Sequence, residues 1–259
     1  MASTMLCAFA QDKVGDIVKS GDNYFAFIAE FNSPEANEEF QRNVSIVQNQ
    51  NSQIKQISDQ IKAEKSEDQK RFLEATLGKL QQEYKQNASL MSRAYGFAEN
   101  RTYKQIYLES NLCFILTKDE IAKLKMIDGT LLDPMKMANK SNFSMYRVKT
   151  VSGAQENEKL QNIFADMIGK QVELNKLRKQ ISETKDALEQ KKLNDKLATL
   201  EKQIKDTDAS IRKTYGIPEK RDYAVEISKS RLYMLLTKEE VAKIEAQIAK
   251  AKKNAPAKK

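Results

Sequence analysis

The sequence predicts an α+β protein, predominantly α, that is a tandem duplication of a β-α-α-β-β-α unit. Two long antiparallel helical hairpins, or coiled-coil arms, are expected on a small antiparallel β base. Three observations predict this fold class: a repeat at a spacing of 120 residues, apolar residues at heptad spacing in two long proline-free segments, and aromatic residues gathered outside those segments.

The repeat is clearest between residues 95–124 and residues 215–244, which align without gaps and are identical at 13 of 30 positions. The same offset relates apolar residues upstream, such as Ile54 and Leu174. One register held over this span indicates a duplication, with its junction near residues 127–141. The predicted organisation is an N-terminal segment 1–20, repeat 1 at 21–140, repeat 2 at 141–248 and a basic disordered tail at 249–259.

Each repeat begins with a β-prone run and a helix start. Residues 24–28 and 143–148 are rich in aromatic and β-branched residues, as strands are. In repeat 1, Ser33 is followed by Pro34, a pair typical of a helix N-terminus because serine caps the free N–H groups and proline suits the first turn. Ser152 is expected to cap the first helix of repeat 2 in the same way.

The long segments that follow predict two helices in each repeat. Apolar residues recur there every three or four positions, as in a coiled coil. Capping boxes that begin at Ser66 and Asp186 occupy equivalent positions, which indicates a second helix start in each repeat. Gly96 and Gly216 are expected to end these helices in the left-handed conformation. The predicted helical hairpins cover residues 33–95 and 153–215, with helices about 42–45 Å long.

Two strands and a short helix are expected after each helical hairpin. The β-prone segments predict β-hairpins at 103–117 and 223–237, with turns at 109–111 and 228–231. Thr117 and Thr237 each precede an acid by three residues, Glu120 and Glu240, which predicts a capping box. The three strands of each repeat would pair into a shared β base, and the large rings near them would hold the main core.

Composition excludes several classes of chemistry. The chain of 259 residues contains no histidine, so imidazole cannot act as a base or a metal ligand. Its two cysteines, Cys7 and Cys113, are too few for a disulfide scaffold or a four-thiolate zinc site. Only eight glycines occur, and neither a dinucleotide-binding nor a P-loop glycine pattern is present. We therefore expect no enzyme, and no catalytic, cofactor-binding or metal-binding residues.

The strongest candidate for a binding or structural motif is a Tyr-Gly pair followed by Arg-x-Tyr, which both repeats contain. Two interpretations are open. The arginine and tyrosine could grip a carboxylate or a phosphate. Alternatively, the first tyrosine and the glycine end a helix while the arginine packs locally and the second tyrosine begins a strand. The residues are Tyr95, Arg101 and Tyr103 in repeat 1, and Tyr215, Arg221 and Tyr223 in repeat 2.

The two ends of the chain suggest a location and explain the charge. Ala8-Phe9-Ala10 before Gln11 is the small-x-small pattern of a signal-peptidase site, so we expect a periplasmic or secreted bacterial protein, and otherwise a cytoplasmic one. The formal net charge is +8, and five of the lysines lie in residues 249–259 with no acid among them. The positive charge is therefore local, and the rest of the chain is nearly balanced.

A layout of strands with protruding helical hairpins resembles that of the periplasmic chaperone Skp and, more distantly, that of prefoldin. The resemblance implies an oligomer whose arms enclose unfolded client proteins. It rests on layout, so no client-binding residue is carried over, and two arms in one chain depart from the single arm of Skp subunits. We expect a non-enzymatic interaction or structural protein with protein partners, including itself. The alternatives are a holdase chaperone and, more weakly, contact of the lysine tail with nucleic acid or an anionic surface.

Overall fold

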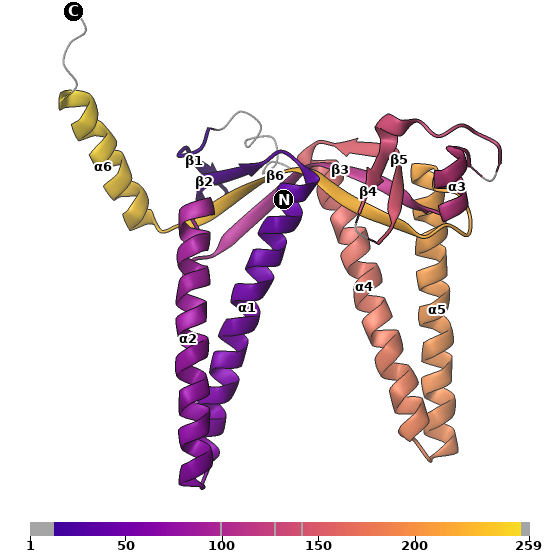
Figure 1. Ribbon diagram of the computed structural model, residues 1–259, viewed down its shortest axis with the longest axis horizontal. Coiled ribbons are helices and arrows are strands. Elements are labelled where there is room, and N and C mark those ends of the chain that lie inside the picture. Colours follow the sequence, from indigo (N-terminus) through magenta and orange to yellow (C-terminus); the bar gives the residue numbers. More distant parts are fainter. Residues whose placement is uncertain (1–12, 99, 127, 141, 255–259) are drawn as a thin grey trace, which may run out of the picture. The chain divides into compact units, whose positions relative to one another are not determined.

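A computed structural model describes residues 13–98, 100–126, 128–140 and 142–254. It is an α+β fold in which six strands form one antiparallel sheet in the order β1-β2-β6-β3-β5-β4 (Figure 1). The candidate signal-peptidase site, Cys7 and the last five residues of the lysine tail lie outside the described residues. Among the described residues, no helix is both long enough and apolar enough to cross a membrane.

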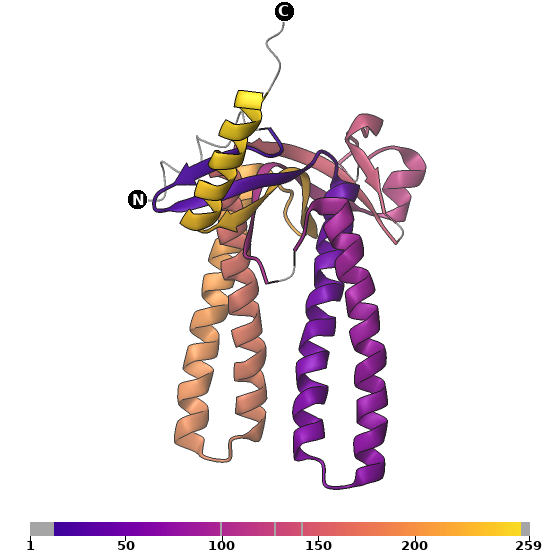
Figure 2. The same cartoon turned by 90° about the vertical axis from the view of Figure 1, so that its left-hand side faces the viewer.

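The first half of the chain begins with a small antiparallel pair of strands and a helical hairpin. Strands β1 (Ile17–Ser20) and β2 (Asn23–Phe31) precede helices α1 (Pro34–Ala63) and α2 (Glu67–Tyr95). The Ser33 hydroxyl accepts from the Ala36 N–H, and the Ser66 hydroxyl accepts from the Gln69 N–H, so serine caps begin both helices. The two helices lie side by side, joined by a short turn (Figure 2).

A long strand and several short elements follow. They are β3 (Tyr103–Leu116), α3 (Lys118–Lys123), the 3₁₀ helix η2 (Pro134–Lys136), β4 (Met137–Asn139) and β5 (Ser144–Ser152). Thr117 and Glu120 make both hydrogen bonds of a capping box at the start of α3.

The second half repeats the helical hairpin and the long strand. Its elements are α4 (Ala154–Glu183), α5 (Ala187–Tyr215), β6 (Tyr223–Leu236) and α6 (Lys238–Asn254). The expectation that Ser152 caps α4 is wrong: Gly153 occupies the N-cap position at φ 95°, and no side chain caps this helix. Helix α6 continues to Asn254, into the segment that we expected to be disordered.

The two predicted β-hairpins are also wrong, because each segment is one continuous strand of 14 residues. The expected turn at 109–111 contains neither glycine nor proline. Its Ser110 and Asn111 are buried, at 0% and 7% exposure, and Glu109–Leu112 pair in register with Lys149–Ser152 of β5. A buried, paired backbone satisfies its hydrogen bonds as a strand, whereas a turn would leave polar groups facing the core.

The chain forms two compact units whose bounds differ from those of the two predicted repeats. Unit 1 contains the described residues up to Ile106 and those from Ser228 onward, and unit 2 contains Tyr107–Ile227. The chain therefore passes from unit 1 to unit 2 inside β3 and returns inside β6. Each of these two strands contributes residues to both units.

Each unit packs a helical hairpin against strands through its own core. In unit 1, Phe31, Phe40 and Met91 pack with Leu232 of β6. In unit 2, Val151, Leu160 and Ile211 pack with Leu112 of β3. A separate cluster of Leu174, Leu177 and Leu200 holds α4 against α5 farther along that hairpin.

Candidate functional site

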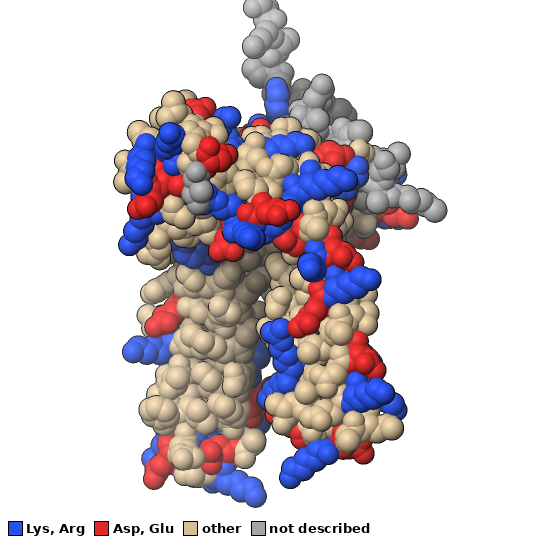
Figure 3. Space-filling view, turned by 90° about the vertical axis from the view of Figure 1, so that its right-hand side faces the viewer, with Lys and Arg blue, Asp and Glu red and all other residues tan. Residues whose placement is uncertain are grey.

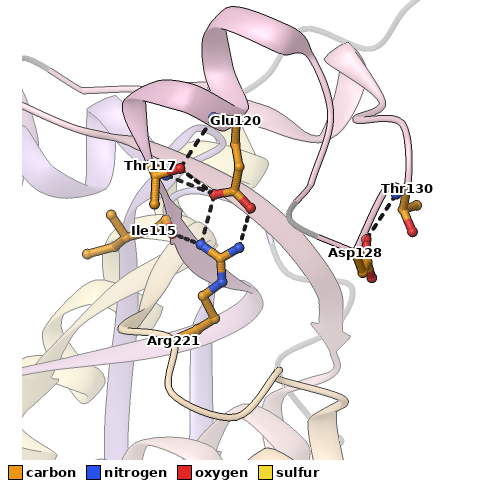
Figure 4. A network of polar contacts seen from close by, with 6 residues as sticks. All are labelled: Ile115, Thr117, Glu120, Asp128, Thr130 and Arg221. Carbon is orange, nitrogen blue, oxygen red and sulfur yellow. Dashed lines mark hydrogen bonds and ion pairs between the residues drawn. The ribbon is translucent and has the colours of Figure 1, made fainter.

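Arg221 lies in a network of polar contacts around the start of α3 (Figure 4). Its guanidinium makes a two-point pair with Glu120, with Nη1 donating to Oε2 at 2.8 Å and Nη2 donating to Oε1. Glu120 is only 2% exposed and also accepts from the Thr117 backbone N–H at 2.9 Å. The guanidinium also stands 5.2 Å from the ring centroid of Phe114. The hydrogen bond to Glu120 raises the pKa of Arg221.

Asp128 lies in the turn after α3 and is part of the same view (Figure 4). Its Oδ1 accepts from the Thr130 backbone N–H at 2.9 Å. This backbone hydrogen bond lowers the pKa of the Asp128 carboxyl because it stabilises the charged form. The Asp128 carboxylate thus stabilises the turn in which it lies, which is a common structural role of aspartate.

Arg101 makes the equivalent pair in unit 1, with Glu240 at the start of α6. Nη1 donates to Oε2 at 2.9 Å, and Nη2 donates to Oε1. The Glu240 carboxylate also accepts from the Thr237 backbone N–H at 2.9 Å. Chiefly through its hydrogen bond, Arg101 lowers the pKa of Glu240 to about 2. This pair is more open than the one in unit 2, since its side chains are 29% and 30% exposed.

The tyrosines that begin β3 and β6 are bound locally. The Tyr103 hydroxyl donates to the Ala98 carbonyl at 3.0 Å, and its ring stacks on Phe97. The Tyr223 hydroxyl donates to Asp208 at 2.8 Å, and the Arg212 guanidinium lies 4.9 Å from its ring centroid. Burial, followed by the hydrogen bond to Asp208, raises the pKa of Tyr223.

The tyrosines that end α2 and α5 pack against the cores of their own units. The Tyr95 ring centroid lies 5.1 Å from that of Phe40 and 5.6 Å from that of Phe31. Tyr215 packs against the core of unit 2. The glycines that follow, Gly96 and Gly216, have φ of 68° and 70°, the left-handed conformation expected from the sequence.

These contacts favour the structural interpretation of the motif. Each guanidinium is already engaged at two points by a carboxylate, so its planar edge is not open to a carboxylate or phosphate ligand. The pairs instead tie the segment after α2 to α6, and the segment after α5 to α3. The sequence pattern favours a role at helix N-termini over a catalytic one for Glu120 and Glu240 and does not predict their pairing with arginine. Their second role was signalled by the repeat, because both pairs combine equivalent positions.

The remaining candidates are also held by the fold. Cys113 is 1% exposed, and burial raises the pKa of its thiol to about 11, so it is not poised as a nucleophile. Lys140 pairs with Glu226 at 2.7 Å in unit 2. In the part of the chain that the structure describes, no group of three or more cysteine, aspartate or glutamate side chains is arranged to hold a metal ion.

Large apolar side chains are exposed on both helical hairpins. On the first hairpin, Ile46 and Leu90 are 42% and 55% exposed. They border a groove of about 270 Å³ between α1 and α2, which is also lined by Asn43, Asn87 and Tyr95. No charged residue occurs between Arg42 and Lys55 of α1. Positive and negative side chains are interspersed on the face of the molecule shown in Figure 3.

The second hairpin has a different apolar patch. Ile168 and Val172, one helical turn apart on α4, are 64% and 49% exposed. Large apolar side chains also stand out farther along both hairpins, where Phe72 is 72% exposed and Leu188 is 68% exposed. Comparison of the chain with protein-family models, with curated proteins and with solved structures found no match.

Proposed function

We propose that this chain is a tandem duplication whose two helical hairpins act as coiled-coil arms of a non-enzymatic interaction protein. The duplication is supported by the sequence repeat and by contacts at equivalent positions, such as Arg101–Glu240 and Arg221–Glu120. A coiled-coil seam is supported in the second hairpin by the cluster of Leu174, Leu177 and Leu200 at heptad-type spacing.

One observation carries the interaction role: each hairpin exposes large apolar side chains at positions that its counterpart fills with polar ones. Ile46 and Leu90 correspond to Asp166 and Ser210, whereas Ile168 and Val172 correspond to Gln48 and Ser52. Exposed apolar side chains that recur on one face mark interaction surfaces more often than scattered single ones do. The two arms would therefore bind different partner surfaces.

The experiment places a photo-crosslinking residue at Leu90 or at Ile168 in the full chain and compares it with the equivalent positions Ser210 and Gln48. We expect crosslinks to protein partners, including a second copy of this chain, from Leu90 and Ile168 and few from the controls. Ile46→Glu, introduced into the chain that carries the crosslinking residue at Leu90, should abolish the crosslinks from Leu90 and leave those from Ile168 unchanged. Equal crosslinking at all four positions would contradict the proposal.

A holdase chaperone is the second candidate, and the exposure of Phe72 and Leu188 favours it. Apolar side chains on long arms can cover apolar segments of an unfolded protein. The test is suppression of aggregation of a chemically unfolded model protein at substoichiometric ratios. Wild-type chain should protect, and Phe72→Glu with Leu188→Glu should protect less. No protection by the wild type would remove this candidate.

A further inference from the structure

Each compact unit combines a helical hairpin from one repeat with a strand segment and a helix from the other repeat. Unit 1 takes its helical hairpin from repeat 1, but it also contains residues 228–248 of repeat 2 and the described tail residues 249–254. Unit 2 takes its helical hairpin from repeat 2, but it contains residues 107–126 and 128–140 of repeat 1. Each repeat therefore contributes the second part of a long strand and the helix that follows it to the unit that holds the hairpin of the other repeat, and repeat 1 also contributes η2 and β4.

The borrowed strand segments are paired and buried in their host unit. In unit 1, residues 230–236 of β6 pair with β2 in antiparallel register, and Leu232, 1% exposed, enters the core beside Phe31 and Phe40. In unit 2, residues 109–116 of β3 pair with β5, and Leu112, 0% exposed, enters the core beside Leu160. Leu112 and Leu232 are equivalent positions of the two repeats.

Polar contacts follow the same exchange. Arg101 pairs with Glu240 rather than with Glu120 of its own repeat, and Arg221 pairs with Glu120 rather than with Glu240. Backbone hydrogen bonds are reciprocal too, since the Leu235 N–H donates to the Thr102 carbonyl and the Ile115 N–H donates to the Asp222 carbonyl, both at 2.9 Å. Such reciprocity is what the exchange of one identical segment between two identical chains produces, as in domain swapping.

We propose that this chain is a covalently fused, strand-exchanged dimer of its 120-residue repeat. The surface formed by β2 and the first helical hairpin is a docking site for the segment 228–242 of a second repeat, and the surface formed by β5 and the second helical hairpin is a docking site for 107–121. Neither repeat is a complete folding unit. The loop that joins them therefore only raises the local concentration of one repeat at the other. This inference extends the proposed duplication and does not depend on what the arms bind.

The first experiment inserts a specific protease site between Asp128 and Gly129, two exposed residues of that loop, in the full chain. After cleavage of the folded protein, the two pieces should elute together at the volume of the uncut chain. Their melting temperature should rise with protein concentration, whereas that of the uncut chain should not, because cleavage makes unfolding a dissociation. Separation of the pieces at micromolar concentration, with the helical signal retained in each, would overturn the proposal.

The second experiment uses charge reversal in the cleaved protein. Arg101→Glu should cause loss of co-elution at concentrations at which the cleaved wild type stays together. Adding Glu240→Arg should restore it, whereas adding Glu120→Arg should not, because the proposed partner lies in the other repeat. Rescue by Glu120→Arg and not by Glu240→Arg would overturn the exchange. Crosslinking from Leu90 and Ile168 reports on the arms separately, so failure of one proposal leaves the other testable.

Discussion

In unit 1, the Ser230 hydroxyl donates to Asn37 Oδ1 at 2.5 Å and accepts from the Gln105 amide at 2.8 Å. In unit 2, the equivalent Ser110 hydroxyl and Asn157 Oδ1 are buried without a hydrogen-bond partner among the described residues, and the position equivalent to Gln105 is Val225, which packs against the core. At corresponding places in the two units, unit 1 thus has a polar network whose hydrogen bonds are satisfied. Unit 2 has an apolar contact there, beside two buried polar atoms whose hydrogen bonds are not. A buried polar atom without a partner costs stability.

For the arginine–glutamate pairs, it is unit 2 that has the better protected contact. The pair in unit 2 is almost enclosed, with Arg221 15% and Glu120 2% exposed, whereas the Arg101–Glu240 pair of unit 1 is about twice as open at its arginine and much more open at its acid. The two units therefore bury their polar contacts to different depths. Residues that correspond in the proposed duplication do not contribute equally to stability, because burial sets the cost of losing a partner.

The largest expected effect is at the enclosed pair. Arg221→Ala leaves the Glu120 carboxylate buried without its guanidinium, so we expect a loss of about 3 kcal/mol in the free energy of unfolding. Arg101→Ala should cost clearly less, because water reaches Glu240. Urea denaturation of the two variants measures the difference, with Lys62→Ala of the exposed Lys62–Asp59 pair as a neutral control. Equal losses for the two arginine variants would refute the contrast.

Cys113 gives a chemical probe of unit 2. Burial raises its pKa to about 11, so at pH 8 its thiolate fraction is about 100-fold below that of a thiol with the ordinary value of 9. In a Cys7→Ser background, a maleimide should label native protein very slowly and unfolded protein rapidly. Arg221→Ala should accelerate labelling more than Arg101→Ala does. A fast reaction in the native wild type would show that the strand around Cys113 is open.

A smaller effect of opposite sign is expected at the two serines. Ser230→Ala removes a hydroxyl with two hydrogen bonds and should destabilise the protein by about 1 kcal/mol. Ser110→Ala removes a buried hydroxyl without a protein partner and should stabilise it by about 1 kcal/mol. Thermal unfolding of both variants measures the signs. Destabilisation by Ser110→Ala would mean that its hydroxyl is satisfied in solution.

The smallest effect is the pH dependence of the open pair. Arg101 lowers the pKa of Glu240 from its ordinary 4.5 to about 2, so the stabilisation is fully present above pH 4.5 and is lost as the pH falls toward 2. Wild type should therefore melt above Arg101→Ala at pH 7, and the difference should shrink between pH 4.5 and pH 2. A melting difference that stays constant across this range would contradict the assigned role of Glu240.

Local signals in the sequence accounted for most helix ends, with the start of α4 as an exception because no side chain caps it. Serine and aspartate at helix starts, and glycine at helix ends, determine where the chain can begin and stop a helix, because these residues satisfy the free backbone groups of the adjoining turn. The break between α4 and α5 follows from Asp186, whose carboxylate accepts from the N–H groups of Leu188 and Glu189. The side-chain caps at helix starts span three residues or fewer and the glycine caps span four to six, so no knowledge of the rest of the fold is needed.

The path of β3 and β6 depended on the tertiary structure. Residues 109–111 are polar and were interpreted as a turn, yet their burial against β5 makes a continuous strand the better solution. Likewise, the sequence showed that Arg101 and Glu240 recur as Arg221 and Glu120, but not which acid each arginine meets. A contact between residues 139 positions apart is decided by where a strand crosses from one unit to the other.

By itself, the sequence indicated the repeated register, the caps at Ser33, Ser66 and Asp186 and the lack of histidine, because these follow from residue identity and short-range hydrogen bonding. Only the tertiary structure decided that each long strand serves two units and that the motif arginines are occupied by carboxylates. The physical reason is burial. Whether a serine, a glutamate or an arginine caps a helix, lies within a strand or is free to bind a ligand depends on the neighbouring groups that exclude water from it.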